Sequence, residues 1–419
     1  MSVISCGIDF GTSNSAIAVS GLDIQPELIK LKNNKFTEPS TIFYREGCSM
    51  PLFGEEAEQA YMDGEQGRFM RSLKRVLGSD LMSSGTLING KLYQFSDILS
   101  LFIKSLKGQA EKHCGQSLEN VVMGRPVHFR DNDEKGDKRA EVELEMIARK
   151  TGFKNVSFQY EPIAAAFAHE ENLEKETLAC VVDIGGGTSD FSVIRLGNKL
   201  REKTERKDDI LANSGVRIGG NDFDKDLNIE CFMPELGYKT TYGLQNLPVP
   251  SSQYFDLAEW SKVNSVYSYK NQKIVSEVLS NAHQPELYAR LLDLIRKENG
   301  HRLLNDVEQT KIILTEQETE YRKLPYIKGA PKICIKKDDF EKSITGDVEK
   351  ISNAMAECLT LAGVKKENIG LVILTGGSTE IPFVQKTMYR YFPHAVFSTE
   401  NKLASVGLGL AFDGRRKFA

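Results

Sequence analysis

The sequence lacks paired cysteines, long apolar runs and an excess of basic charge, and each absence excludes a class of protein. Its seven cysteines are dispersed without a CxxC pair, which argues against a zinc site and suits a reducing compartment. No stretch approaches the roughly 18 apolar residues that a membrane span needs. The N-terminal segment MSVISCGIDF has no basic region of the kind that begins a signal peptide. We therefore expect a cytoplasmic protein without a membrane segment.

The composition is typical of a globular protein, with 40% apolar and 27% charged residues. The formal net charge of −4 provides no general attraction to nucleic acid or to an anionic membrane surface. We therefore expect neither a nucleic-acid partner nor a membrane partner, and we expect a monomer. A chain of 419 residues is too long for one ordinary core and sufficient for two.

A strand–turn–strand pattern occurs in both halves of the chain. Residues 9–14 read DFGTSN and residues 183–190 read DIGGGTSD, and each segment lies between two short apolar runs. A single copy could arise by chance, whereas two copies in matching context indicate a duplicated domain that faces itself across a cleft.

Apolar residues at helical spacing predict helices between these strands. One such stripe ends near Gly152, which is a plausible helix stop. Charged stretches from Pro285 to Lys297 and from Asp306 to Lys323 also have the pattern of helices. The two clearest apolar stripes consist of Leu99, Phe102, Ile103 and Leu106, and of Ala140, Leu144, Ile147 and Ala148.

The repeat predicts two lobes, each with an inserted subdomain. The first lobe is expected at 1–177, with an insert at about 39–116, and is completed by a C-terminal helix at 403–419. The second lobe is expected at 178–402, with an insert at about 221–334 that is rich in proline and polar residues.

Both repeated turns carry the residue types that bind a nucleoside triphosphate. Phosphate oxygens need backbone N–H donors at close range, glycine lets the backbone approach without a side-chain clash, and neighbouring hydroxyls add donors. Because one such turn is weak evidence and two led by aspartates are much stronger, we predict phosphate binding at both. The predicted phosphate-binding residues are Gly11, Thr12, Ser13, Asn14, Gly185, Gly186, Gly187 and Thr188.

The aspartates that lead these turns, Asp9 and Asp183, lie at the ends of apolar strands. A carboxylate in such a place is costly unless it is paired or faces a cation. Two carboxylates from opposite lobes suit Mg²⁺, which prefers few carboxylates and several waters. We therefore expect Mg²⁺ to be held there through water, with turn formation or helix capping as the alternative role.

Two further glycine turns could lie against the base or the ribose of a nucleotide. One contains Gly376, Gly377 and Ser378 after the apolar run that ends at Leu374, and the other contains Gly219 and Gly220. Each signal is weak when it is taken alone.

Five motifs carry a family resemblance over essentially the whole chain, and they read VISCGIDFGTSNSAIAV, EPIAAAFAH, VVDIGGGTSDFSVI, RIGGNDFD and LVILTGGSTEIPFVQ. In this order they resemble the ATPase domain of the DnaK-type heat shock protein 70 family. The resemblance implies an α/β protein with the actin-like ATPase fold, in which two RNase H-like lobes with inserted subdomains enclose a nucleotide cleft. It also implies ATP or ADP with Mg²⁺ as ligands, and slow ATP hydrolysis with nucleotide-controlled closure of the lobes.

The resemblance also assigns roles to individual residues. The segment SLKRVLG matches the family's catalytic-lysine segment, so Lys74 inherits that role. Glu161, Asp183 and Asp190 would arrange the attacking water and the Mg²⁺ hydration shell. Thr12 and Thr188 would donate to the phosphates. In the segment VEQTKIILT, the positions that match residues bonding the ribose and the base are Glu308, Lys311 and Thr315.

The sequence departs from the family pattern at several places. Ile312 and Glu380 stand where relatives place the two basic residues that sandwich adenine, and an aspartate of the family is replaced around Asn401-Lys402. Because the sequence ends at Ala419, we expect no peptide-binding domain, and in this the chain resembles the short bacterial relatives typified by YegD. We therefore expect a chaperone-like ATPase with an unidentified protein client or co-factor.

Two alternatives share the same fold. A small-molecule kinase would need a sugar-binding insert and an aspartate base near the turn at Pro126. That turn has no such aspartate before Arg130, although Asp131 and Asp133 follow it. An actin-like filament or interaction protein would share the glycine turns. A panel of sugars with ATP would test the first alternative, and ATP-dependent sedimentation would test the second.

Overall fold

The computed structural model describes residues 4–130, 133–170, 173–200, 203, 205–398 and 405–418. The chain forms two compact units, of which the first comprises Met1–Val216, Ala354–Thr379 and Tyr389–Ala419 and the second Arg217–Asn353 and Glu380–Met388. These units are groups of residues that lie close together, and their limits do not test the predicted lobe boundaries, which stay a prediction. In the described ranges, no helix is both long and apolar enough to cross a membrane.

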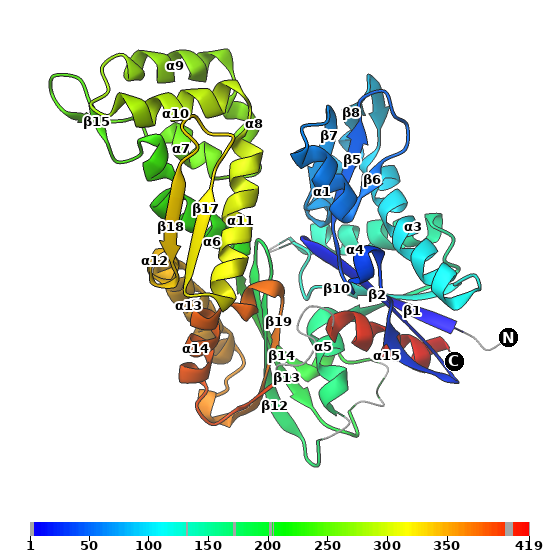
Figure 1. Ribbon diagram of the computed structural model, residues 1–419. Helices are drawn as coiled ribbons and strands as arrows, with labels where there is room; N and C mark the ends of the chain where they lie inside the picture. Colours follow the sequence, from blue (N-terminus) through cyan, green and yellow to red (C-terminus); the bar gives the residue numbers. More distant parts are fainter. Residues whose placement is uncertain are drawn as a thin grey trace. The chain divides into compact units, whose positions relative to one another are not determined.

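The first unit contains a six-stranded sheet with the order β11-β10-β1-β2-β3 and with β4 paired to β2 (Figure 1). Strand β1 runs antiparallel to β2 and parallel to β10. The predicted turn at 9–14 therefore joins two neighbouring antiparallel strands. The strands are β1 (Ile4–Phe10), β2 (Asn14–Gly21), β3 (Ile24–Leu28), β4 (Glu38–Pro39), β10 (Asn120–Arg125) and β11 (Asn155–Tyr160).

A second sheet in the same unit repeats this plan in the order β14-β13-β12-β19-β20 (Figure 1). Strand β12 runs antiparallel to β13 and parallel to β19, as β1 does to β2 and β10. The predicted duplication of the strand–turn–strand pattern is therefore confirmed. The strands are β12 (Thr177–Ile184), β13 (Ser189–Leu196), β14 (Ile210–Val216), β19 (Ile369–Thr375) and β20 (Val396–Ser398).

Two helices of the first unit pack closely against each other and against these sheets. Helix α15 (Ser405–Phe418) lies on β1, β2 and β10, and helix α5 (Glu161–Glu170) lies on β12 and β13. The helices approach so closely that a Cβ atom at Gly409 would lie 1.9 Å from the Ala164 carbonyl oxygen. Of the predicted helix at 403–419, residues 403, 404 and 419 lie outside the described residues.

The predicted helices of the first lobe are confirmed. Helix α3 (Phe95–Cys114) buries its apolar stripe, and helix α4 (Glu134–Lys150) ends just before Gly152, whose φ of +97° favours glycine. The expected insert carries most of the remaining elements, which are β5 (Thr41–Arg45), β6 (Leu52–Phe53), α1 (Gly54–Met62), β7 (Gly67–Arg71), α2 (Leu81–Ser84), β8 (Thr86–Ile88) and β9 (Lys91–Tyr93).

The second unit is mainly helical (Figure 1). Its two hairpins pair β15 (Thr241–Tyr242) with β16 (Leu247–Pro248), and β17 (Thr319–Lys323) with β18 (Lys332–Lys336). Helices that lie in it or overlap its limits are α6 (Gly220–Leu227), α7 (Ser252–Leu257), α8 (Val263–Val266), α9 (Tyr269–Leu279), α10 (Pro285–Arg296), α11 (Gly300–Glu316), α12 (Lys337–Ser343), α13 (Thr345–Leu361) and α14 (Pro382–Tyr391).

One predicted helix of this unit is partly wrong. The helix expected from Asp306 to Lys323 ends at Glu316, and Thr319–Lys323 is strand β17. The strand forms because it pairs antiparallel with β18, in which Ile333 and Ile335 are buried on alternate positions. Helix α10 confirms the prediction for Pro285 to Lys297 to within one residue.

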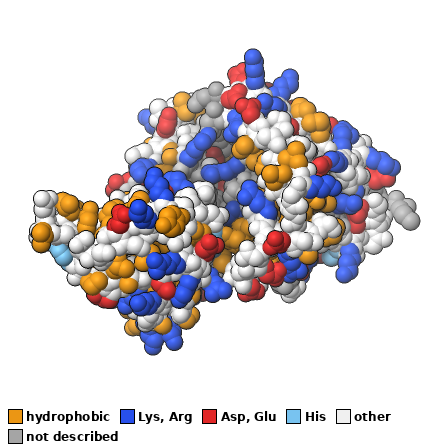
Figure 2. Space-filling model, turned by 90° about the horizontal axis from the view of Figure 1, so that it is seen from above, with side chains coloured by type: hydrophobic (Ala, Val, Ile, Leu, Met, Phe, Trp, Pro, Cys, Tyr) orange, Lys and Arg blue, Asp and Glu red, His pale blue; other side chains and the backbone are white. Residues whose placement is uncertain are grey.

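The visible surface carries mixed charge. On the face seen in Figure 2, lysine and arginine side chains are interspersed with aspartate and glutamate side chains. This distribution agrees with the small net charge of −4.

Candidate functional site

Three carboxylates surround one lysine in the first unit, and a fourth lies beside one of the three. Asp9 and Asp183 lie near the ends of β1 and β12, Asp190 pairs with Asp183 across the hairpin, and Glu161 begins α5. Lys74 lies on a short 3-10 helix at Leu73–Val76, and its Nζ is 2.7 Å from Glu161 Oε1. Both side chains of this pair are nearly buried, with 11% and 13% exposed.

Burial and repulsion by neighbouring carboxylates perturb two members of this cluster, Asp9 and Asp183. Burial and, less strongly, the Glu161 carboxylate together raise the pKa of Asp9 to about 7, and the Lys74 ammonium opposes the change. Burial raises the pKa of Asp183 well above its usual range, and so do Asp190, Glu161 and Asp9, whereas Lys74 lowers it. When its members are ionised, the cluster carries more negative charge than one ammonium neutralises, so a bound cation would favour the ionised forms.

Lys74 itself stays protonated in this environment. Burial lowers the pKa of its ammonium, but Glu161, Asp9 and Asp183 together raise the pKa above its ordinary value. In the described part of the chain, no group of three or more acidic, histidine or cysteine side chains is arranged to hold a metal ion directly. A divalent ion held through its own waters by Asp9 and Asp183 would not need such a group.

The two repeated turns present backbone donors beside these aspartates. A Cβ atom at Gly11 would lie 2.1 Å from the Asn14 carbonyl oxygen, so only glycine fits there. The amide of Gly185 donates to the Thr188 carbonyl at 2.9 Å, which closes the second turn. Consecutive unpaired amides of this kind form nests that bind anions. Within the described residues, no protein acceptor faces the amides of Thr12, Ser13, Gly186 and Gly187.

A third glycine turn packs against the second. Gly376 has a φ of +83°, and a Cβ atom there would lie 2.6 Å from Asp183 Oδ1. Ser378 Oγ donates to the Gly185 carbonyl at 3.1 Å. Gly377 begins the short 3-10 helix Gly377–Glu380, which contains Ser378. The structure therefore brings the predicted residues 376–378 to the second phosphate turn.

In the second unit, the structure brings together two other predicted segments. Lys311 on α11 lies 2.8 Å from Asp224 Oδ2 and 3.3 Å from the Gly220 carbonyl oxygen on α6. Gly219 precedes this helix, and its amide donates to Asp222 at 2.9 Å. The remaining predicted residues of α11 are Glu308, Thr315, whose Oγ1 donates to the Lys311 carbonyl, and Ile312, whose exposed fraction is 52%.

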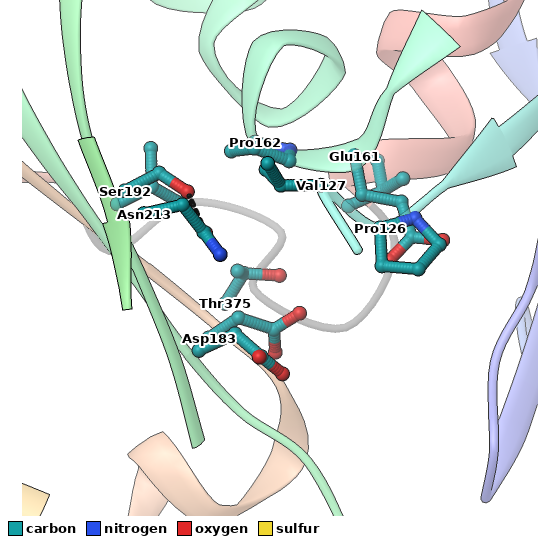
Figure 3. Close-up of a pocket in the computed structure, with 11 residues that line it drawn as sticks. Pro126, Val127, Glu161, Pro162, Asp183, Ser192, Asn213 and Thr375 are labelled. Atoms are coloured by element: carbon teal, nitrogen blue, oxygen red, sulfur yellow. Dashed lines mark hydrogen bonds between the residues drawn. The ribbon is translucent and has the colours of Figure 1, made fainter. Parts of the chain in front are cut away.

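Sequence reasoning missed a pocket that adjoins the carboxylates of the first unit. In Figure 3, Asn213 and Ser192 line one side of it, near Thr375 and Asp183, and residues 126, 127 and 162 form the opposite side. Asp190 also lines the pocket. Alternation along the strand after Asp190 was the available signal, because Ser192 lies two positions further on the same face.

The residues relevant to the kinase alternative and to one family departure are only partly described. The side chain of Asp133 caps helix α4 by accepting from the Gly136 amide at 2.9 Å, so it has a structural partner. Asp131 lies outside the described residues, as do Asn401 and Lys402.

A protein-family model matches most of the sequence. The model described as "Hsp70 protein" matches residues 5–283 and 288–415. This family implies the actin-like ATPase fold, and the paired sheets of the first unit agree with it. The chain thus belongs to the Hsp70 protein family.

Proposed function

We propose that this protein binds MgATP at the two glycine turns of the first unit and slowly hydrolyses it to ADP and phosphate. Membership of the Hsp70 family supports ATP binding and a chaperone-like function in general. The observation that carries the finer proposal is the set of unpaired amides in both turns, each next to an aspartate of the carboxylate cluster.

The phosphate groups would be bound by backbone donors rather than by a row of cationic side chains. The amides of Thr12, Ser13, Gly186 and Gly187 and the hydroxyls of Thr12 and Thr188 would supply those donors. The glycines leave room for the close approach, and Ser378 fixes the second turn through the Gly185 carbonyl.

Hydrolysis would depend mainly on positioning and on charge stabilisation. Lys74 would hold the γ-phosphate, where its ammonium neutralises charge that develops as the phosphoryl group transfers. Glu161 holds Lys74 in place through the 2.7 Å ion pair. Asp183 and Asp190 would accept hydrogen bonds from the attacking water and orient it.

The carboxylate cluster fits a magnesium ion. Burial and the neighbouring carboxylates raise the pKa values of Asp9 and Asp183, and a cation would favour the ionised forms that these shifts oppose. Asp9 and Asp183 would hold the ion through water. When bound, Mg²⁺ supplies charge neutralisation at the phosphate oxygens.

The residues that we propose for the adenosine end of the nucleotide, from the family resemblance, are Gly376, Gly377, Gly219, Gly220, Glu308, Lys311 and Thr315. The proposal for the second unit rests on the family resemblance together with the contact between Lys311 and Gly220. We also propose nucleotide-controlled closure of the lobes and an unidentified protein client or co-factor, both of which rest on the family resemblance.

Calorimetric titration with MgATP and a single-turnover hydrolysis assay would test this proposal. Gly185→Asp places a negative charge in the second turn, where a Cβ atom would meet only the Thr188 carbonyl oxygen at 3.7 Å, so the fold should tolerate it. The variant should lose ATP binding. Gly346→Asp is a matched control, since a Cβ atom at Gly346 meets nothing within 4 Å. Equal ATP affinity in the native chain and in Gly185→Asp would rule out phosphate binding at this turn.

A further inference from the structure

One row away from the carboxylates of the second sheet, on the same face, lies a hydrogen-bonded pair of polar side chains, Ser192 and Asn213. The strand register aligns Asp190, Asp183 and Thr375 in one row across β13, β12 and β19. Two positions along each strand, on the same face, the next row contains Asn213, Ser192, Val181 and Ile373. Rows two residues apart on one face lie about 7 Å apart, within reach of a bridging water.

The corresponding row of the first sheet is entirely apolar. Because β1, β2, β3 and β10 correspond to β12, β13, β14 and β19, the equivalent row reads Leu28, Ala18, Gly7 and Val122. Helix α15 covers that row so closely that a Cβ atom at Gly7 would lie 2.3 Å from the Ala411 amide. The polar pair is therefore a departure from the duplicated plan, at the place where the second sheet borders the pocket.

Burial makes this departure costly unless the polar atoms are paired. Ser192 is only 3% exposed, and its hydroxyl donates to Asn213 Oδ1 at 2.9 Å. This bond orients the carboxamide so that Nδ2 points into the pocket (Figure 3). Within the described residues, the structure gives Nδ2 no protein acceptor.

The donor inventory of the pocket explains why a carboxamide is useful there. Its acidic lining groups, Glu161, Asp183 and Asp190, accept hydrogen bonds when they are ionised. A water that donates both of its hydrogens to two of these carboxylates still has lone pairs that need a donor. The Nδ2 group of Asn213 supplies that donor, whereas the opposite orientation would turn Oδ1 toward the carboxylates.

We propose that Asn213 is a positioning residue for ATP hydrolysis, which holds a water against the carboxylates of Asp183 and Glu161 and is itself oriented by Ser192. This inference rests on the proposed function. The water would keep both carboxylates hydrogen-bonded on the pocket side. The other oxygen of Asp183 would then stay directed at the attacking water, while Glu161 Oε1 keeps its ion pair with Lys74. The nucleotide's phosphates need no contact with Asn213, so its role belongs to the rate and not to affinity.

The experiment measures single-turnover ATP hydrolysis and, separately, the Kd for ATP. Asn213→Ala removes the donor and should lower the hydrolysis rate by about 10-fold, as expected for the loss of one hydrogen bond to a charged group, with Kd changed less than about 2-fold. Asn213→Thr retains one O–H donor on a residue suited to a strand and should restore most of the rate. Ser192→Ala frees the carboxamide and should lower the rate less than Asn213→Ala does.

Ser214→Ala is the matched control, because Ser214 pairs with Phe191 on the opposite face of the same strand. It should leave the rate and Kd unchanged. Hydrolysis at the native rate in Asn213→Ala, or equal losses in hydrolysis rate and in ATP affinity, would overturn the assignment. If Asn213→Ala fails to fold, a native rate in Ser192→Ala would overturn it instead. A native chain that binds ATP without hydrolysing it would refute the proposed hydrolysis and this inference together, whereas native hydrolysis with unaffected variants would refute the inference alone.

Discussion

Lys74→Ala should separate ATP hydrolysis from ATP binding. The ammonium of Lys74 lowers the pKa values of both Asp9 and Asp183, and its Nζ lies 2.7 Å from Glu161 Oε1. The two glycine turns do not depend on this side chain, because their amides belong to the hairpins of β1–β2 and β12–β13. The variant therefore removes transition-state charge stabilisation while it leaves the phosphate donors in place.

The expected magnitude follows from these roles. Removing one preorganised group that stabilises developing charge costs roughly 10²–10³ in rate, or about 2.7–4 kcal/mol. Loss of one ground-state phosphate contact should weaken ATP binding by no more than about 10-fold, or about 1.4 kcal/mol. Removing Lys74 also leaves Glu161 unpaired in a nearly buried place, which can cost about 3–5 kcal/mol of stability.

The assay combines single-turnover hydrolysis with calorimetric ATP titration. Lys74→Ala with Glu161→Gln removes both charges of the pair, so it should be more stable than the single variant while it stays slow. Lys154→Ala is a control, because this lysine pairs with Glu119 on the surface. Thr188→Ala should slow hydrolysis less than Lys74→Ala does. Hydrolysis at the native rate in Lys74→Ala would remove Lys74 from the mechanism, and equal losses in rate and affinity would make it a binding residue.

Four further outcomes are expected. Saturating MgATP should raise Tm, since a ligand at 100 times its Kd adds about 2.7 kcal/mol of stability, and an unchanged Tm would mean that no nucleotide binds. Gly409→Val should lower Tm, because its side chain would clash with the Ala164 carbonyl. Gly108→Ala in α3, where a Cβ atom meets nothing within 4 Å, should instead raise the free energy of unfolding in urea titrations by about 0.5–1 kcal/mol. Burial, Asp347 and Asp222 raise the pKa of Asp226 to about 7, so folding favours the protonated form of this carboxyl. The native chain should therefore lose stability as the pH rises from roughly 4 to 7, and Asp226→Asn should lose less stability over that range. Parallel curves of stability against pH for the two proteins would contradict this. Glu380→Arg should tighten ATP binding by about 10-fold and raise the preference for ATP over GTP if that position faces adenine, and no gain in paired titrations would refute the alignment.

The elements that could be predicted from sequence are those with local causes. Each repeated turn needs glycine, a preceding aspartate and flanking apolar residues, and all of these are neighbours in the chain. The stripes of α3 and α4 have helical period, and both are buried as expected. Lys74 is different, because only the family resemblance pointed to it, and the structure then places it against Glu161, 87 residues later.

The prediction for residues 306–323 failed because the pattern of charges is ambiguous over short lengths. The segment Thr319–Lys323 alternates in a way that a helix also permits, and its strand partner lies beyond the turn at 324–331. Pairing with β18 decides the outcome, so the cause is a contact and not a propensity. Asp224 belongs to the motif RIGGNDFD, yet its role as the ion-pair partner of Lys311 depends on the packing of α6 against α11.

The pocket row depends on register, which a single sequence does not contain. Ser192 and Asn213 are 21 residues apart and become neighbours because β13 pairs with β14 in one register, with an irregularity between Val193 and Ile194. A shift by one residue would turn Ser192 to the opposite face and remove it from the carboxylate side. In the first sheet the same position is Ala18, and a helix covers it, so duplication alone predicts an apolar row. The two copies therefore diverge where the second one borders the pocket, and this asymmetry identifies Asn213 as a residue whose polar group needs a functional explanation.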